Sequence, residues 1–338
     1  MTDIDLRQFA DWLRLQDYGF GELVSVRRFE GGQSNPTYLL EAEAGTFVLR
    51  RKPFGTTLPS AHAVEREFEL LSKLHPAGFP VARPIALCED PAAIGAPFYV
   101  MEHVDGRTFW DARLPGVPKA ERSNIHFAML SALARLHKLP VEMLRPDATT
   151  KGRNYLSRQI SRWITQYRAA QSEEIGAIEK LIEWLPQHMP AQQHIAIVHG
   201  DYRIDNVIFD RHRAEVAVVI DWELATLGDP LADLSYLLMN WHLPADGQAA
   251  LGNLDLAALG LPTADELLAR YAVESGIDVP DSLDWYFAFN LFRGAAIIQG
   301  IRQRLQQGNA SSKEAAQVVD RLRPMAEAGW SFALRAGA

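Results

Sequence analysis

The sequence has few of the features that mark secreted, zinc-binding or membrane-spanning proteins. It contains one cysteine, Cys88, among 338 residues, which excludes an internal disulfide framework and a zinc site built from cysteines. No apolar run approaches the roughly 20 residues needed to cross a bilayer. The N-terminal residues are acidic and lack the apolar segment of a secretion signal. We therefore expect a cytoplasmic protein that does not engage a membrane.

The sequence also lacks a basic block. The net charge is −8, so nucleic acid is a poor candidate partner. The apolar content of 48% and the charged content of 22% are those of an ordinary soluble globular protein. A chain of 338 residues is too long for one simple core and suits two lobes of unequal size.

The most informative stretch is residues 199–221, which begins H-G-D-Y-R-I-D-N-V-I-F-D and ends V-A-V-V-I-D. Two short β-branched runs joined by a polar turn predict a β-hairpin. This hairpin would bring Asn206 and Asp221 to the same end, close to Asp201. A carboxylate that can accept a proton, beside an amide and a carboxylate that can share a hard cation, is what phosphoryl transfer from Mg-ATP requires.

The rest of the chain predicts an α+β fold with two lobes. Residues 1–105 begin with a short amphipathic helix over 6–15 and then alternate apolar and polar residues in short runs. They predict a small antiparallel sheet that binds a nucleotide, with a helix over 61–74 inserted after the third strand. Residues 106–338 predict a larger, mainly helical lobe with the catalytic loop and the acceptor site. Its expected helices cover 119–138, 155–170, 174–189, 231–241, 264–274, 282–306 and 313–336.

A glycine-rich turn lies between the first two expected strands. It contains Gly31, Gly32, Ser34 and Asn35. Glycines let backbone N–H groups approach a phosphate closely, so these four residues are candidates for nucleotide binding. The turn does not have the G-x-x-x-x-G-K-S/T pattern of P-loop enzymes, and a Gly-Gly hairpin turn with no ligand is common.

The motif at 199–221 resembles the catalytic segment of eukaryotic-like kinases, H-x-D-x-x-x-x-N followed by D-x-G. It is more similar to the aminoglycoside phosphotransferase and choline kinase family, in which H-G-D replaces H-R-D. It resembles most the kinase-like domains that are fused to some acyl-CoA dehydrogenases, and G-G-Q-S-N-P-T-Y at 31–38 is also similar to the family pattern. The resemblance implies a bilobal protein-kinase-like fold, ATP and Mg²⁺ as cofactors, Asp201 as catalytic base, and Asn206 and Asp221 as magnesium ligands.

The strand F-V-L-R at 47–50 is similar to the V-A-I-K strand of kinases. Period-two alternation puts Val48 and Arg50 on the same face. The resemblance then places Val48 over the adenine and Arg50 at the α- and β-phosphates, with Lys52 as the rival cation. Glu67 matches the family string R-E-F and would hold the cation, although a charge on a helix face often has no such role.

The segment 98–106 resembles the kinase hinge, which implies that main-chain groups of Glu102 and Val104 read the adenine edge after Met101. Arg203 is a candidate for stabilising charge in the transition state, and a solvated salt bridge to Asp205 is the alternative.

Two departures from protein kinases favour a small-molecule substrate. Gly200 stands where protein kinases have the arginine that reads a phosphorylated activation loop. Only seven residues separate Asp221 from Asp229, too few for a peptide-docking segment. Asp229 reads as a helix N-cap before Pro230, and we expect Asp233 to brace the catalytic loop.

We expect the acceptor to be a small molecule with a hydroxyl group, and the sequence describes its site poorly. Arg158, Trp163 and Arg293 stand on helices where arginines interleave with aromatic residues, a pattern that could bind an anionic, partly apolar acceptor. A solvated helix face is the alternative. The resemblance to kinase domains fused to acyl-CoA dehydrogenases suggests a hydroxy acid or a hydroxyacyl-CoA.

The sequence therefore predicts an ATP-dependent enzyme that phosphorylates a hydroxyl of a small metabolite. An aminoglycoside or choline-type kinase is one alternative, although charges of only −5 for residues 1–106 and −3 for the remainder do not favour a polycationic substrate. A catalytically idle, nucleotide-binding regulatory protein is the other alternative. The presence of Asp201, Asn206 and Asp221 together argues against it.

Overall fold

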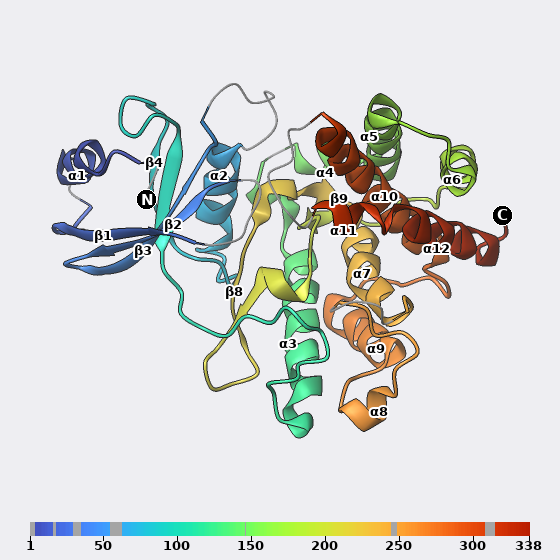
Figure 1. The fold of residues 1–338 in the computed structure, drawn as a ribbon. Helices are drawn as coiled ribbons and strands as arrows, with labels where there is room; N and C mark the ends of the chain where they lie inside the picture. Colours follow the sequence, from blue (N-terminus) through green and yellow to red (C-terminus); the bar gives the residue numbers. More distant parts are fainter. Residues whose placement is uncertain are drawn as a thin grey trace. The chain divides into compact units, whose positions relative to one another are not determined.

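The computed structural model describes residues 4–15, 18–29, 35–54, 63–145, 147–244, 249–307 and 315–338, and the chain divides into two compact units (Figure 1). The first unit comprises Met1–Phe109 and Asp205–Leu224, and the second comprises Trp110–Ile204 and Ala225–Ala338. Within the described ranges no helix is both long and apolar enough to span a bilayer. The α+β class predicted from the sequence is confirmed.

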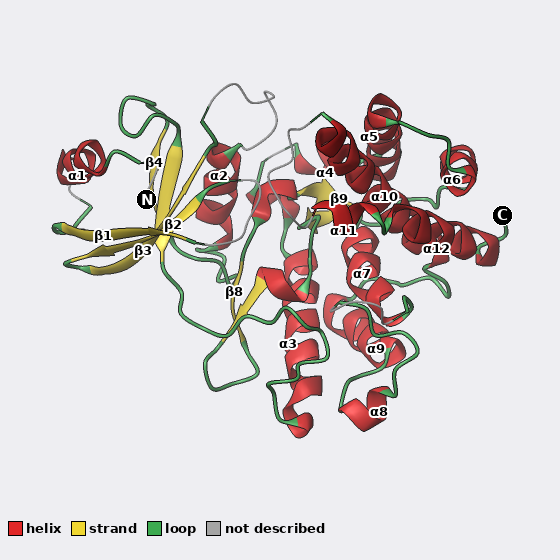
Figure 2. Cartoon of the chain, viewed as in Figure 1, coloured by secondary structure: helices red, strands yellow, loops and turns green. Residues whose placement is uncertain are grey.

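The first unit is built on a five-stranded antiparallel sheet in the order β1-β2-β3-β5-β4 (Figure 2). Helix α2, inserted after the third strand as the sequence predicted, packs against β4 and β5. The elements are α1 (Leu6–Leu15), β1 (Leu23–Arg28), β2 (Thr37–Ala42), β3 (Gly45–Arg51), α2 (Val64–Leu74), β4 (Pro84–Cys88) and β5 (Phe98–Glu102).

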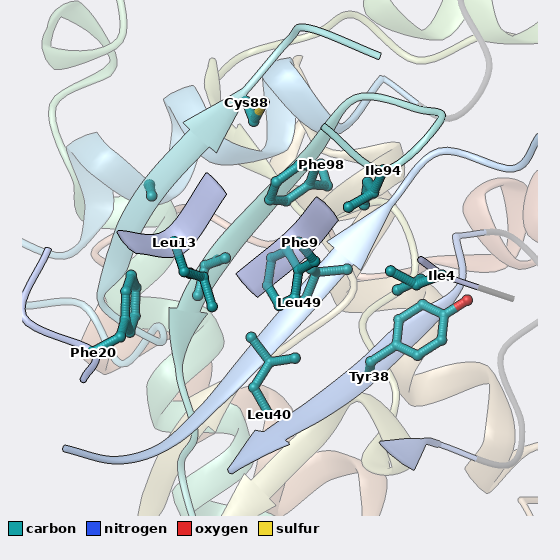
Figure 3. Close-up of a cluster of buried hydrophobic side chains, with 12 residues drawn as sticks. Ile4, Phe9, Leu13, Phe20, Tyr38, Leu40, Leu49, Cys88, Ile94 and Phe98 are labelled. Carbon is teal, nitrogen blue, oxygen red and sulfur yellow. The ribbon is translucent and has the colours of Figure 1, made fainter. Parts of the chain in front are cut away.

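A hydrophobic cluster covers the face of this sheet that packs on α1 (Figure 3). Phe9 and Leu13 of α1 meet Leu49 of β3, and Phe47 packs against the edge of the cluster. Each such side chain contributes roughly 1.5–3 kcal/mol on full burial. Because Phe47 and Leu49 occupy this face, the alternation of β3 turns Val48 and Arg50 to the other face, as the sequence predicted.

The predicted hairpin is also present and consists of β7 (Val207–Phe209) and β8 (Val216–Val219). It is grouped with the sheet unit, although it falls within the predicted helical lobe of residues 106–338 in sequence. The amide of Val219 donates to the carbonyl of Pro80 at 2.8 Å, and Arg107 and Phe209 exchange backbone hydrogen bonds of 2.8 and 2.9 Å. These bonds attach the hairpin to the N-terminal part of the chain.

The second unit is mainly helical. In it α10 packs against α5, α7 and α12, and α3 packs against α9. A two-stranded antiparallel ladder joins β6 (Ala196–Val198) to β9 (Thr226–Gly228). The helices are α3 (Lys119–Lys138), α4 (Ala148–Gly152), α5 (Tyr155–Ala170), α6 (Gly176–Gln187), α7 (Pro230–Leu238), α8 (Leu256–Leu259), α9 (Ala264–Ser275), α10 (Asp284–Gln306), α11 (Ala315–Val319) and α12 (Leu322–Arg335).

One helix expected from the sequence is wrong. The span 313–336 was expected to be continuous, but α11 ends at Val319 and α12 begins at Leu322. Pro324 explains the break, because a proline has no N–H to donate and its ring clashes with the carbonyl four residues earlier in a continuous helix. In the structure Pro324 lies in the first turn of α12, where no such donor is required.

Candidate active site

An ion-pair cluster around Arg50 is the central feature of the first unit. Arg50 Nε lies 2.9 Å from Glu67 Oε2, and Arg50 Nη2 lies 2.7 Å from Asp221 Oδ1. Glu223 Oε2 is 3.9 Å from the same Nη2. Burial lowers the pKa of Arg50, but the negative charges around it, Glu67 foremost, outweigh burial and raise the pKa well above its ordinary value. The guanidinium therefore stays charged and is surrounded by carboxylates.

The rival cation, Lys52, is engaged elsewhere. Its Nζ lies 2.5 Å from Glu65 Oε1, so α2 pairs Glu65 with Lys52 and the buried Glu67 with Arg50. The pair between Arg50 and Glu67 that the sequence predicted is present. Glu65 is half-buried and is held by Lys52.

Asn206 and Asp221 lie at the same end of the β7–β8 hairpin, as the sequence predicted. The amide of Ile220 donates to the carbonyl of Asn206 at 3.0 Å, which ties the residue before Asp221 to Asn206. Asp221 has a positive φ of 65°, a conformation that costs a non-glycine residue about 1–2 kcal/mol. Trp222 is buried beneath this turn and donates to the carbonyl of Val219 at 2.9 Å.

Asn206 and Asp221 suit a hard divalent ion, because amide and carboxylate oxygens are ligands that Mg²⁺ accepts while phosphate and water oxygens complete its shell. The described residues contain no group of three or more His, Cys, Asp or Glu that could hold a metal unaided. These two side chains could therefore hold a Mg²⁺ ion whose remaining ligands are oxygens of the substrate phosphates and of water.

In the second unit, Asp233 of α7 holds the H-G-D loop. Its carboxylate accepts hydrogen bonds from the amides of His199 at 2.6 Å and Gly200 at 2.8 Å. His137 Nε2 lies 3.4 Å from the same carboxylate. Although burial opposes the charge, these bonds and the nearby histidines lower the pKa of Asp233. The bracing role that the sequence predicted for Asp233 is confirmed, and Asp229 is the N-cap of α7 as expected.

Asp201 is held from two sides within the second unit. Its amide donates to His199 Nδ1 at 3.2 Å, and its Oδ1 accepts from the hydroxyl of Tyr236 at 2.7 Å. His199 is fully buried beneath the loop. Sequence reasoning missed Tyr236, because a tyrosine in the apolar run of α7 resembles a core residue.

Arg293 of α10 lies beside this loop. It is 8% exposed, its Nη2 donates to the carbonyl of Gly200, and its guanidinium lies over the rings of Trp163 (5.7 Å) and Tyr236 (5.2 Å). It makes no ion pair with any residue in the described parts of the chain. Trp163 Nε1 is buried and has no hydrogen-bond partner among those residues. Arg293 and Trp163 are therefore together, whereas Arg158 donates to the carbonyl of Arg153 at the exposed start of α5.

The expected nucleotide-binding residues are only partly described. Gly31, Gly32 and Ser34 lie outside the described residues. Asn35 is 3% exposed, and both polar atoms of its amide lack a hydrogen-bond partner among the described residues. A buried, unpaired amide carries a free-energy cost that a ligand could relieve.

In the hinge-like segment, the amide of Glu102 donates to the carbonyl of Arg83 at 3.0 Å and is not free for adenine. This leaves the Glu102 carbonyl and the Val104 amide as the main-chain candidates. Met101 and Val104 are half-buried, Val48 is buried, and Arg203 is exposed.

The predicted convergence of Asp201 with Asn206 and Asp221 involves residues of both units and stays a prediction.

Comparison with known proteins agrees with this arrangement. Residues 25–272 match the model of the phosphotransferase enzyme family. The chain is 44% identical over 316 residues to mouse acyl-CoA dehydrogenase family member 10, covering 93% of this chain but 30% of that protein. The chain thus spans about a third of that curated relative.

Two solved structures are also similar. A "putative aminoglycoside phosphotransferase" of Ralstonia eutropha is 41% identical, with a TM-score of 0.87 and coverage of 98% of this chain and 99% of that one. Spectinomycin phosphotransferase, solved with ADP and spectinomycin, is 13% identical, with a TM-score of 0.65 and coverage of 98% and 99%, and shares the fold. The chain belongs to the phosphotransferase enzyme family.

Proposed function

We propose that the protein transfers the γ-phosphate of Mg-ATP to a hydroxyl of a small anionic metabolite, a hydroxy acid or a hydroxyacyl-CoA. The observation that carries the anionic character is Arg293. A buried guanidinium without a carboxylate partner among the described residues is costly, and stacking on Trp163 and Tyr236 offsets only part of that cost. A carboxylate or phosphate of the acceptor would supply the missing counter-charge through charge-assisted hydrogen bonds.

The proposed reaction uses residues on both units. The oxygen of the acceptor hydroxyl forms a bond to the γ-phosphorus, the bond to the bridging oxygen breaks, and that oxygen leaves with ADP. Asp201 receives the hydroxyl proton, a contribution typically worth about 10²–10⁴ in rate. Arg50 and Arg203 would stabilise phosphate charge, and Asn206 and Asp221 would hold Mg²⁺, which supplies further neutralisation of that charge.

Nucleotide binding is proposed for the residues that the sequence indicated. Gly31, Gly32, Ser34 and Asn35 would contact the phosphates, and Val48, Met101, Glu102 and Val104 would enclose the adenine. The ADP complex of spectinomycin phosphotransferase, which shares the fold, supports an adenine nucleotide as the donor. Glu67 would act indirectly by holding Arg50.

A matched acceptor screen tests the proposal. Transfer from radiolabelled ATP is measured to hydroxy acids, to their uncharged amides, to hydroxyacyl-CoAs, to choline-like amines and to aminoglycosides. We expect activity on the acids or thioesters and a preference for each acid over its amide. Arg293→Gln should remove that preference, and Arg293→Lys should retain part of it. Activity confined to aminoglycosides would contradict the proposed acceptor, and the absence of transfer or ATP hydrolysis would contradict the enzyme itself.

A further inference from the structure

The hydroxyl of Tyr236 donates a hydrogen bond to Oδ1 of Asp201 at 2.7 Å. Tyr236 projects from α7, the same helix that carries Asp233 and its bonds to the H-G-D loop. Burial foremost, and the nearby negative charge of Asp201, raise the pKa of Tyr236 far above its ordinary value. The phenol therefore stays neutral and can donate to the carboxylate across the range in which an enzyme works.

Tyr236 is itself held in place. The guanidinium of Arg293 lies 5.2 Å from the centre of its ring and also donates to the carbonyl of Gly200, the residue before Asp201. Helix α7 is fixed to α10 by Asn290, whose amide nitrogen donates to Ala232 O at 3.1 Å and to Ser235 Oγ at 2.9 Å. Thus one helix pair controls both the backbone before Asp201 and the hydroxyl that contacts its side chain.

We propose that Tyr236 is a positioning residue for the base: its hydrogen bond to Asp201 Oδ1 sets the orientation in which the carboxylate receives the proton of the acceptor. This inference rests on the proposed function, in which Asp201 is the base. A carboxylate that is free to rotate presents its oxygens in many orientations, whereas one fixed oxygen restricts the group to the geometry that proton transfer needs. Arg293 supports this arrangement through the ring of Tyr236 and the carbonyl of Gly200.

Two other roles of Tyr236 give different outcomes. If its hydroxyl occupied the place of the acceptor hydroxyl, removing it would speed the reaction. If it only satisfied a buried polar group, removing it would lower stability and leave the chemical step unchanged. The proposed role instead lowers kcat and acts through Asp201.

The test uses the full chain with Mg-ATP alone, so that water is the acceptor. The oxygen of the water forms a bond to the γ-phosphorus, the bond from that phosphorus to the bridging oxygen breaks, and the bridging oxygen leaves with ADP. One proton of the water goes to Asp201. We expect Tyr236→Phe to lower kcat about 10- to 100-fold with an unchanged KM for Mg-ATP. Tyr167→Phe is the matched control, because Tyr167 is buried in the same unit and its hydroxyl has no partner among the described residues.

A double-mutant cycle shows whether the effect passes through Asp201. In the Asp201→Asn background, single-turnover measurements with enzyme in excess over radiolabelled ATP read the slow residual rate. We expect Tyr236→Phe to change that rate less than about twofold, because the group it positions is no longer a base. Equal losses in the two backgrounds, or a faster Tyr236→Phe enzyme, would overturn the inference.

A measurement independent of activity separates this inference from the proposed function. In a crystal structure of Tyr236→Phe, the Asp201 side chain should spread over more than one orientation, while the bonds from Asp233 to the loop persist. A single unchanged orientation would overturn the positioning role even in an active enzyme. The parent enzyme could show neither phosphate transfer nor ATP hydrolysis while Asp201 still becomes disordered in Tyr236→Phe. That result would contradict the proposed function but would agree with Tyr236 as the residue that orients Asp201.

Discussion

Asp221 Oδ1 lies 2.7 Å from Nη2 of Arg50 although the two residues are 171 positions apart in the chain. The same guanidinium also contacts Glu67. In the proposed function Arg50 binds phosphate and Asp221 binds Mg²⁺, so each would exchange part of this contact for the substrate. The ion pair therefore holds the two charged groups next to each other, and each neutralises the charge of the other before a nucleotide binds.

Replacing Arg50 should weaken nucleotide binding. We expect Arg50→Ala to raise the KM for Mg-ATP by about tenfold or more, the equivalent of one charge-assisted hydrogen bond. Steady-state kinetics at saturating acceptor measures it. Lys52→Ala is the control, because Lys52 pairs with Glu65 and should leave the KM within about twofold. Equal effects of the two substitutions would contradict the assignment of Arg50 to the phosphates.

Asn206 and Asp221 should control the magnesium requirement. We expect Asp221→Asn to raise the Mg²⁺ concentration for half-maximal activity and to lower kcat by about 10²-fold or more, because the ion loses a charged ligand. Asn206→Ala should act in the same direction. A magnesium titration of the ATPase rate at fixed ATP measures both. An unchanged titration curve in both variants would remove these residues from the metal site.

Asp233→Asn should lower both stability and activity. An asparagine offers one acceptor oxygen and one donor nitrogen, so one of the amides of His199 and Gly200 would face a donor. We expect a loss of about 3–5 kcal/mol in the free energy of unfolding, measured by urea titration, since a buried charge network is broken. Asp229→Asn is the control, because asparagine is an equally good N-cap and burial already raises the pKa of Asp229. Asp229→Asn should lower the free energy of unfolding much less than Asp233→Asn does.

His126 should make the protein less stable in mild acid. Burial lowers the pKa of His126 from 6.5 to about 4, against a weaker opposing effect of its bond to the Ala112 carbonyl. Between these two pH values the unfolded chain binds a proton that the folded chain does not, so stability falls as pH falls through this window. The loss approaches about 3 kcal/mol near pH 4. Urea unfolding at several pH values should show this slope, and His126→Phe should flatten it.

Local patterns predicted most of what is local in the structure. The alternation in β3 was sufficient to place Arg50 opposite the apolar face, and the hairpin of residues 207–219 followed from two β-branched runs around a polar turn. The N-cap at Asp229 followed from Asp-Pro at a helix start. Such signals depend only on neighbours in sequence, so they can be recognised without knowing how distant parts of the chain pack.

Contacts between distant elements could not be predicted from the same patterns. Tyr236 reaches Asp201 only because α7 presents that face to the loop while α10 supports it. Arg293 was noticed as one of several arginines on helices, but its burial against Trp163 depends on how α5 and α10 pack. Glu223 also approaches Arg50, and no sequence signal distinguished it from an ordinary turn residue.

The glycine of the H-G-D loop has a consequence for how this enzyme can evolve. Gly200 has a φ of 85° while its N–H bonds to Asp233 and its carbonyl accepts from Arg293. Any other residue at this position would strain the backbone. The arginine through which protein kinases sense a phosphorylated activation loop would therefore cost about 1–2 kcal/mol in backbone strain at this position unless the loop changed with it, which disfavours the evolution of that form of control in this enzyme.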